Sequence, residues 1–295
     1  MSSALTLRRL LVAATLISCL VGAFILREAG IDDVGISYRY ARHLADGSGL
    51  TWNAGEEPVE GYSNLLWVLI LAVGHLFGAD IEILSRVLGL LLGVGTLYLT
   101  YRIASSVDPD TPHPFPTIVP LLVALTPAWL MWMMSGLEIA LYSFLLVAAT
   151  RALTMKGRRR IVVMSVSLSA LILTRPEGIG LAGCYLFTAW MLRDKSQGRP
   201  LSGLLIPILA VLATISGATL FRLAYYGYPL PNTVYAKFLH ALPLGRSGGA
   251  LVGLHVSLPA AMGNHCPLVV ANSRQDHYAR CDCSRPNANS SGSSS

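Results

Sequence analysis

Charged side chains are scarce in this chain of 295 residues. Asp, Glu, Lys and Arg together make up 13% of it and hydrophobic residues make up 53%. The charged share is about half of that in an ordinary soluble domain. The composition therefore excludes a typical water-soluble enzyme and predicts an all-α protein that crosses a membrane several times.

Cysteine is also rare, and the few cysteines present predict no disulfide framework. Two of the five lie in apolar runs, where a thiol usually acts as a small buried hydrophobe. The formal net charge is +6, but the basic residues are spread over short loops between apolar runs, where they act as topology signals. We therefore expect membrane lipids and no nucleic acid among the partners.

Eight apolar stretches are near the length that a helix needs to cross a bilayer. They are 10–26, 64–78, 83–101, 117–134, 137–153, 161–174, 178–192 and 204–223. Arg8 and Arg9 precede the first stretch as in a signal peptide, but no A-x-A cleavage site follows, so we interpret it as a retained helix. We predict seven or eight spans.

Three short basic loops predict the orientation of these spans, because such loops stay in the cytoplasm. They are the N-terminus, "MKGRRR" at 155–160 and "RDKSQGR" at 193–199. Counting from them places the segments 27–63, 174–178 and 225–237 outside. Counting crossings backward from the loop 155–160 places "SGLE" at 135–138 outside, whereas counting forward from the first stretch places it inside. One apolar stretch therefore does not cross the membrane, either 64–78 or 117–134.

The external loop 27–63 begins with two adjacent carboxylates, Asp32 and Asp33, followed by a helical pattern over 34–46. Ile36, Tyr40 and Leu44 share one face of this helix, which we expect to lie along the membrane surface. Capping of the helix by Asp33 is the simplest explanation for one carboxylate, and Gly47 is expected to end the helix in a left-handed conformation.

Capping does not explain a second carboxylate. One of the pair is therefore a candidate base or ligand, with capping and solvation as the alternative. The remainder of the loop, "GSGLTWNAGEEPVEGYSN", alternates turn residues with aromatic and acidic ones, as an ordered lid does. Among its acids, Glu60 is the candidate functional residue.

Four motifs carry a resemblance to a known family. They are "DD-x-x-I-S-x-R-Y-A-R-x-L-A-x-G-x-G-L-x-W-N-x-G-E-x-P-V-E-G-Y-S-N-x-L-W" from Asp32 to Trp67, "SGLE" at 135–138, "TRPEG" at 174–178 and "YYG-x-x-L-P-N-T-x-Y-A-K" at 225–237. Over about residues 8 to 240 the chain resembles the bacterial multispanning glycosyltransferases of the GT-C type, and among them the arabinofuranosyltransferase-like and protein-mannosyltransferase-like enzymes. The resemblance implies a GT-C-like transmembrane helix bundle over residues 1–240.

The resemblance also implies an activity. A sugar would pass from a polyprenyl-phosphate donor to a glycan, lipid or protein acceptor outside the bacterial plasma membrane, with inversion, and Asp32 and Asp33 fall on the catalytic acidic motif. A phosphate leaving group needs positive charge, which Arg39, Arg175, Arg222 or Lys237 would supply. A divalent cation is a further possibility that the resemblance leaves open.

Each remaining candidate has a structural alternative. Arg175 and Glu177 are proposed to bind substrate, or else to pair only with each other across Pro176. Glu138 is expected to be an acid placed favourably at a helix N-terminus. Asn232 and Lys237 are candidate contacts to sugar or phosphate. We treat Arg86 as a structural residue that extends toward the membrane interface.

The match ends near Leu242. Residues 241–295 have no apolar periodicity and end in a Ser/Asn/Gly tail, so they are predicted to be disordered, and a truncated or frameshifted reading frame would explain the break. Two other interpretations of the chain remain open. A transporter or lipid-sugar flippase would place ionisable residues within its spans, and an inactive fragment of a glycosyltransferase would lack part of its pocket.

Overall fold

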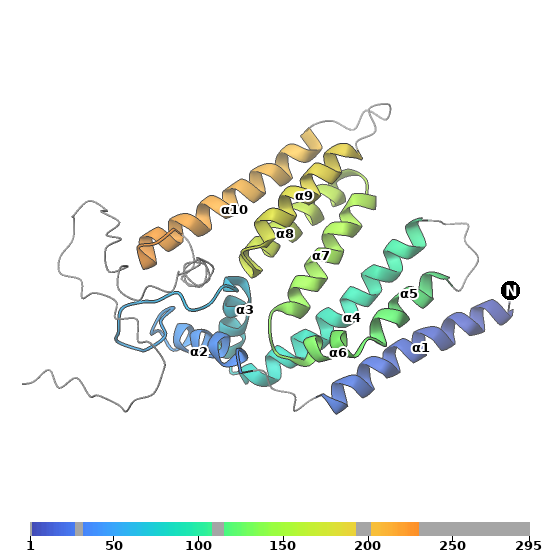
Figure 1. Cartoon of the computed structure of the whole chain (residues 1–295), viewed down its shortest axis with the longest axis horizontal. Coiled ribbons are helices and arrows are strands. Elements are labelled where there is room, and N and C mark those ends of the chain that lie inside the picture. Colours follow the sequence, from blue (N-terminus) through green and yellow to red (C-terminus); the bar gives the residue numbers. More distant parts are fainter. Residues whose placement is uncertain (1, 27–31, 108–114, 193–201, 230–295) are drawn as a thin grey trace, which may run out of the picture. The chain divides into compact units, whose positions relative to one another are not determined.

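The structure is a computed structural model that describes residues 2–26, 32–107, 115–192 and 202–229. These residues form helices and the turns between them, and none of them lies in a strand, so the all-α prediction is confirmed for this part of the chain (Figure 1). The helices are α1 (Ser2–Ile25), α2 (Val34–Ala45), α3 (Leu65–Leu76), α4 (Ile81–Val107), α5 (Phe115–Ala124), α6 (Pro127–Met134), α7 (Ile139–Thr154), α8 (Gly157–Thr174), α9 (Gly178–Met191) and α10 (Ser202–Tyr226).

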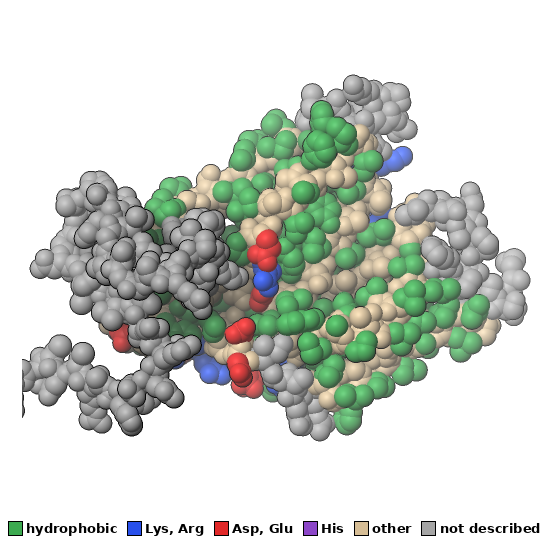
Figure 2. All heavy atoms as spheres, viewed as in Figure 1, with side chains coloured by type: hydrophobic (Ala, Val, Ile, Leu, Met, Phe, Trp, Pro, Cys, Tyr) green, Lys and Arg blue, Asp and Glu red, His purple; other side chains and the backbone are tan. Residues whose placement is uncertain are grey.

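Apolar side chains cover much of the helix surface, as they do in proteins that contact lipid (Figure 2). Two of the described helices are long and apolar enough to cross a membrane, within Ile81–Ser106 and Gly203–Tyr226. Helices α5 and α6 pass the same test together but are bent by 68° at the break between them. Shorter apolar helices are found in α1, α3, α7 and α9. The chain is thus a helical membrane protein with two or three candidate spans by length and composition.

The break between α5 and α6 follows from two residues. Pro127 occupies the start of α6, where its fixed φ suits a helix. A residue before proline is restricted to extended conformations, and Thr126 accordingly has φ −80° and ψ 111°. Helix α5 cannot continue through such a residue, so the chain turns there.

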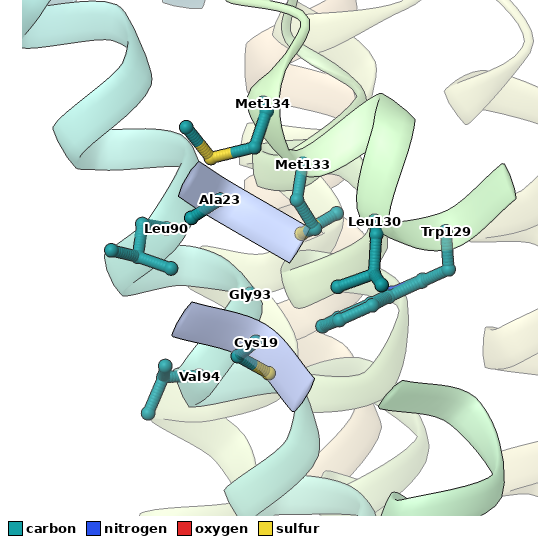
Figure 3. Close-up of a pocket in the computed structure, with 9 residues that line it drawn as sticks. All are labelled: Cys19, Ala23, Leu90, Gly93, Val94, Trp129, Leu130, Met133 and Met134. Atoms are coloured by element: carbon teal, nitrogen blue, oxygen red, sulfur yellow. The ribbon is translucent and has the colours of Figure 1, made fainter. Parts of the chain in front are cut away.

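Small residues let α6 approach its neighbours closely. An added Cβ on Gly22 of α1 would lie 2.8 Å from Leu130, and one on Gly93 of α4 would lie 2.6 Å from the Met133 sulfur. Close approach through glycine is the usual way in which helices associate in lipid. The remaining space between α1, α4 and α6 is an apolar cavity of only ≈ 10 Å³ beside Cys19 and Trp129 (Figure 3). It is too small and too apolar to hold a polar substrate.

Helices α4 and α7 run in the same direction. Gly89 of α4 lies against Ala140 of α7, and farther along both helices Gly95 lies against Phe144. At the start of both, an added Cβ on Gly136 would touch Tyr38 of α2. The N-terminal ends of α4 and α7 therefore meet α2 at one end of the helix bundle.

The sequence predicted both limits of α2 closely. The helix spans Val34–Ala45, and Gly47 follows with φ +81°. The Ser48 N–H donates to the His43 carbonyl at 2.8 Å and the Gly47 N–H to the Leu44 carbonyl at 3.3 Å, which is the pattern of a Schellman motif. The predicted left-handed end at Gly47 is confirmed.

The buried side of α2 differs in part from the predicted face. Tyr40 is fully buried as expected, but Ile36 and Leu44 are only half-buried. The other buried positions are Val34, Ser37, Tyr38 and Ala41. The apolar period alone did not reveal this face, because Ser37 and Tyr38 are buried through polar partners on other helices.

Candidate functional site

Asp32 and Asp33 lie at the start of α2, and both are exposed. Asp33 occupies the N-cap position with φ −61° and ψ −20°, but its carboxylate accepts no capping hydrogen bond from the backbone. Capping by the Asp33 side chain, the simplest prediction from sequence, is therefore wrong. Among the described residues, no side chain covers either carboxylate.

A polar network lies one helical turn from Asp33. We define it by Ser37, Asn64, Glu138, Arg175 and Glu177. The Asn64 side-chain amide donates to the Ser37 hydroxyl at 2.9 Å and to Glu138 Oε2 at 2.7 Å. Asp33 and Ser37 are four residues apart and so share one side of α2. The network therefore starts on the side of α2 that Asp33 occupies.

Arg175 joins the two carboxylates of this network. Its Nη1 donates to Glu138 Oε1 at 2.7 Å and its Nε donates to Glu177 Oε1 at 2.7 Å. The prediction that Arg175 and Glu177 pair only with each other is wrong, since Glu138 also contacts Arg175. Glu138 is itself buried, with 5% of its surface exposed, which the expectation of a simple N-terminal acid did not include.

The electrostatics of the polar network favour a fixed, charged guanidinium. Burial lowers the pKa of Arg175, but the hydrogen bond to Glu177 and the charges of Glu138 and Glu177 raise it more, so its pKa lies above the ordinary value. The side chain is 32% exposed, and its Nη2 donates to none of the described residues. One face of this guanidinium thus remains available to a ligand.

Two buried polar atoms near the network lack hydrogen-bond partners among the described residues. One is Asn64 Oδ1, and the other is the hydroxyl of Tyr142, which follows Glu138 by one turn of α7. Buried polar groups are normally paired. A water molecule or a substrate hydroxyl at each atom would supply the missing hydrogen bond.

Glu60 forms a second buried ion pair. Arg222 of α10 donates through Nε to both Glu60 oxygens, at 2.9 and 3.2 Å, and Glu60 is 3% exposed. Burial raises the pKa of Glu60 above its ordinary value, and the hydrogen bond and charge of Arg222 oppose this rise without cancelling it. Glu60, predicted to bind substrate, here has a protein partner.

Tyrosines fasten the loop 46–63 to the last turn of α10. The Leu50 N–H donates to the Tyr225 hydroxyl at 3.0 Å, and the Tyr226 hydroxyl donates to the Leu50 carbonyl at 3.0 Å. The Tyr62 and Tyr226 hydroxyls lie 3.1 Å apart, and Tyr62, which is deeply buried, has a raised pKa through desolvation. The predicted ordered lid is consistent with these contacts.

Arg39 differs from the other two arginines because no carboxylate of the described residues pairs with it. Its Nη2 donates to Asn53 Oδ1 at 2.9 Å, and its guanidinium lies 4.4 Å from the centre of the Trp52 ring. A cation–π contact of this kind stabilises the charge by about 0.5–2 kcal/mol without neutralising it. Among the described residues, the contacts of Arg39 are therefore with an amide and a ring and not with a carboxylate.

Not every candidate can be placed. Asn232 and Lys237, as well as the segment 241–295, lie outside the described residues. In the described part of the chain, no three His, Cys, Asp or Glu side chains are grouped as metal ligands. The use of a divalent cation, which the sequence left open, is therefore neither supported nor excluded by the described residues.

Reasoning from the sequence missed three members of the polar network. Glu138 was expected to act only at its own helix N-terminus, and Ser37 and Asn64 were not singled out. Their signal was present, because all three lie within the "DD…SN" and "SGLE" motifs on which the resemblance depends. Compared with protein-family models, curated proteins and solved structures, the chain matches none of them.

Proposed function

We propose that this protein is a membrane glycosyltransferase that moves a sugar from a polyprenyl-phosphate donor to an acceptor outside a bacterial plasma membrane. The observation that supports this most is the position of Asp32 and Asp33. Two exposed carboxylates, which accept no hydrogen bond from the other described residues, lie one turn of α2 from a network that presents a guanidinium. The resemblance carried by the four motifs supplies the substrate class.

Asp33 is the better candidate for the base. In the proposed reaction, the acceptor hydroxyl gives its proton to this carboxylate while its oxygen forms a bond to the anomeric carbon of the sugar. The bond from that carbon to the phosphate oxygen breaks, and the phosphate leaves with the electron pair. Such a single displacement inverts the anomeric centre. Asp32 is the alternative base, or else orients the acceptor.

The three arginines of the site have different roles in this proposal. Arg222 is paired with Glu60 and positions the loop 46–63. Arg175 is paired with two carboxylates, so its cluster has a formal charge of −1 and suits sugar hydroxyls better than a phosphate. Arg39 pairs with no carboxylate of the described residues, and it follows Asp33 by six residues, or about 9 Å along the helix. Arg39 is accordingly our candidate for the leaving phosphate.

The charges also support the proposed orientation. We call the end of the helix bundle where α2 meets the starts of α4 and α7 the acidic end. Every Asp and Glu in the described residues lies just before α2, in the loop 46–63, just before or within the first turn of α4, or just before α7 or α9. The loop 155–160, rich in Arg, lies at the other end of α7, and short basic loops face the cytoplasm. The acidic end would then face outward.

If α3 does not cross the membrane, both ways of counting spans place the segment 135–138 outside, in agreement with this orientation. Helix α3 has 12 residues, or about 18 Å of length, which is too short for a bilayer core of about 30 Å. Asn64, just before α3, bonds Ser37 of α2, and Ser85, near the start of the next helix α4, bonds Tyr38 of α2. Both flanks of α3 therefore lie at the acidic end, which leaves α5 and α6 as one bent span.

The experiment uses the purified full-length protein in lipid vesicles with polyprenyl-phosphate arabinose or mannose, radiolabelled in the sugar, and an acceptor glycan. We expect Asp33→Asn to lower transfer by about 10²-fold or more, the usual contribution of a general base, and Asp32→Asn to lower it less. The control Asp46→Asn removes an exposed carboxylate at the other end of α2 and should leave transfer within about twofold of wild type.

Two results would overturn the proposal. Equal transfer by wild type, Asp32→Asn and Asp33→Asn would remove both aspartates from the chemistry. Failure of the wild-type protein to transfer either sugar, while it moves the labelled lipid between leaflets, would favour a flippase instead.

A further inference from the structure

An apolar groove far from the acidic end opens between α1, α4 and α5. It has a volume of ≈ 290 Å³, near the lower end of the range for small-molecule sites, about 300–1,000 Å³. Its walls include Val12 and Leu16 of α1, Val94 and Leu97 of α4 and Pro120 of α5. Val12 and Leu16 are 44% and 45% exposed, so the groove is open along its side.

A cationic side chain lies beside one wall of this groove. Tyr98 lines the groove, and Arg102 Nη1 donates to the Tyr98 hydroxyl at 2.8 Å while the guanidinium lies 5.8 Å from the centre of the ring. Both side chains are exposed, and no carboxylate of the described residues pairs with Arg102. The groove thus combines apolar walls with a positive charge at its edge that no carboxylate of the described residues balances.

The position of Arg102 separates this groove from the site for the sugar donor. Arg102 follows Ser85 by 17 residues of α4, which is about 25 Å along the axis. Because α4 and α7 run in parallel, Arg102 lies toward the end of the bundle that carries Arg151, Arg158 and Arg159. A single phosphate cannot contact Arg102 and the acidic end at once, so a ligand at Arg102 is a second molecule.

We propose that the groove binds an acyl chain of an anionic phospholipid whose phosphate accepts hydrogen bonds from Arg102. A groove that opens sideways from a helix within a bilayer is filled by hydrocarbon chains, since water is absent there. The lipid phosphate would complete the hydrogen bonding of Arg102 with a charge-assisted contact. The inference needs only that α4 spans the membrane, and it does not depend on sugar transfer.

Native mass spectrometry of the detergent-purified full-length protein, titrated with phosphatidylglycerol or phosphatidylcholine, tests the proposal. We expect one phosphatidylglycerol to bind more tightly than phosphatidylcholine. Arg102→Gln should weaken phosphatidylglycerol about tenfold and phosphatidylcholine by a smaller factor, because the choline cation offsets the charge of the phosphate in phosphatidylcholine. Val94→Trp, which fills the groove, should weaken both lipids. Tyr98→Phe should weaken the binding of phosphatidylglycerol by a smaller factor. This variant removes the hydroxyl that orients Arg102, but its ring still forms the wall of the groove.

The matched control is Arg151→Gln. It removes an arginine from the last turn of α7, at the same end of the bundle as Arg102, and this variant should bind both lipids as wild type does. Asp33→Asn should also bind them normally, so a failure of the proposed transfer reaction is distinguishable from a failure of lipid binding. Equal loss of phosphatidylglycerol in Arg102→Gln and Arg151→Gln would overturn the proposal. So would a homodimer that Val94→Trp dissociates without any change in bound lipid, since the groove would then hold a second copy of the chain.

Discussion

The Glu60–Arg222 pair gives the sharpest test of how the loop 46–63 is held. Glu60 is 3% exposed and the Arg222 side chain 17% exposed, so removing one partner leaves the other buried and charged. Arg222→Gln should lower the free energy of unfolding by about 3–5 kcal/mol at neutral pH. For a protein of this size, that is a fall in the melting midpoint on the order of 10 °C.

A double-mutant cycle adds Glu60→Gln and the double variant, which should lose less stability than Arg222→Gln does or than the two single losses together predict. Glu60→Gln keeps an oxygen that can accept from Arg222, so we expect a smaller loss of about 1–3 kcal/mol. The double variant leaves no buried charge and should be more stable than the sum of the two losses predicts, by about 0.5–3 kcal/mol. Thermal unfolding in detergent, followed by tryptophan fluorescence, measures all three variants.

The pH dependence of the same cycle follows from the raised pKa of Glu60. The folded protein keeps the Glu60 proton to a higher pH than the unfolded chain does. Its free energy of unfolding therefore falls as the pH rises from the ordinary value of 4.5 to the raised value. Glu60→Gln should remove this fall. In Arg222→Gln the carboxyl loses the charge that opposes protonation, so the loss of stability should be smaller at pH 5 than at pH 7.5.

The exposed variant Arg42→Gln provides the control for these measurements. Arg42 lies on α2 and contacts no carboxylate of the described residues, so its replacement should change the free energy of unfolding by less than about 0.5 kcal/mol. If Arg222→Gln and Arg42→Gln unfold at the same temperature at both pH values, then the ion pair does not hold the loop and the reasoning fails.

Three further predictions concern the acidic end. Gly47→Ala and Gly136→Ala both place a side chain at φ near +80°, which costs about 1–2 kcal/mol of stability. Of these two glycines, only Gly136 has neighbouring atoms in the space of an added Cβ, so Gly136→Ala should lose about 1–3 kcal/mol more in the same unfolding assay. Equal losses in the two variants would contradict this close contact. Glu138→Gln should lower sugar transfer about 10²-fold with helix content unchanged by circular dichroism, because it loosens Arg175; full activity would make Glu138 merely structural. Arg39→Gln should lower kcat for transfer more than Arg39→Lys does, since lysine keeps the charge, and identical kcat values would exclude a role at the phosphate.

Local patterns predicted the elements of this site better than their partners. The limits of α2 and its end at Gly47 could be predicted because both depend on residues close in sequence. The capping by Asp33 was predicted on the same basis and was wrong, since Asp33 adopts a helical backbone conformation instead of the extended one typical of a capping residue, and its side chain makes no capping hydrogen bond. Local preference identifies a position without fixing the side chain there.

The ion pairs could not be predicted from the sequence, because their partners are distant along it. Glu60 and Arg222 are separated by 162 residues, and Glu138 and Arg175 by 37. From its sequence neighbours alone, each of these residues can be explained as an acid in a loop, an acid at a helix end or a basic residue at the membrane interface. Only the packing of α8 against α7, and of α10 against the loop 46–63, selects among the many opposite charges available.

The polar contacts also explain how an apolar bundle can position a reactive group. Lipid chains are as apolar as Leu, so burial of apolar surface does not favour one helix register over another in a membrane. Hydrogen bonds at the acidic end do discriminate, because a shift of one residue would leave Asn64 and Glu138 buried without partners. Three side chains, Ser37, Asn64 and Glu138, therefore link Arg175 to α2, and the apolar helices supply the frame on which these side chains meet.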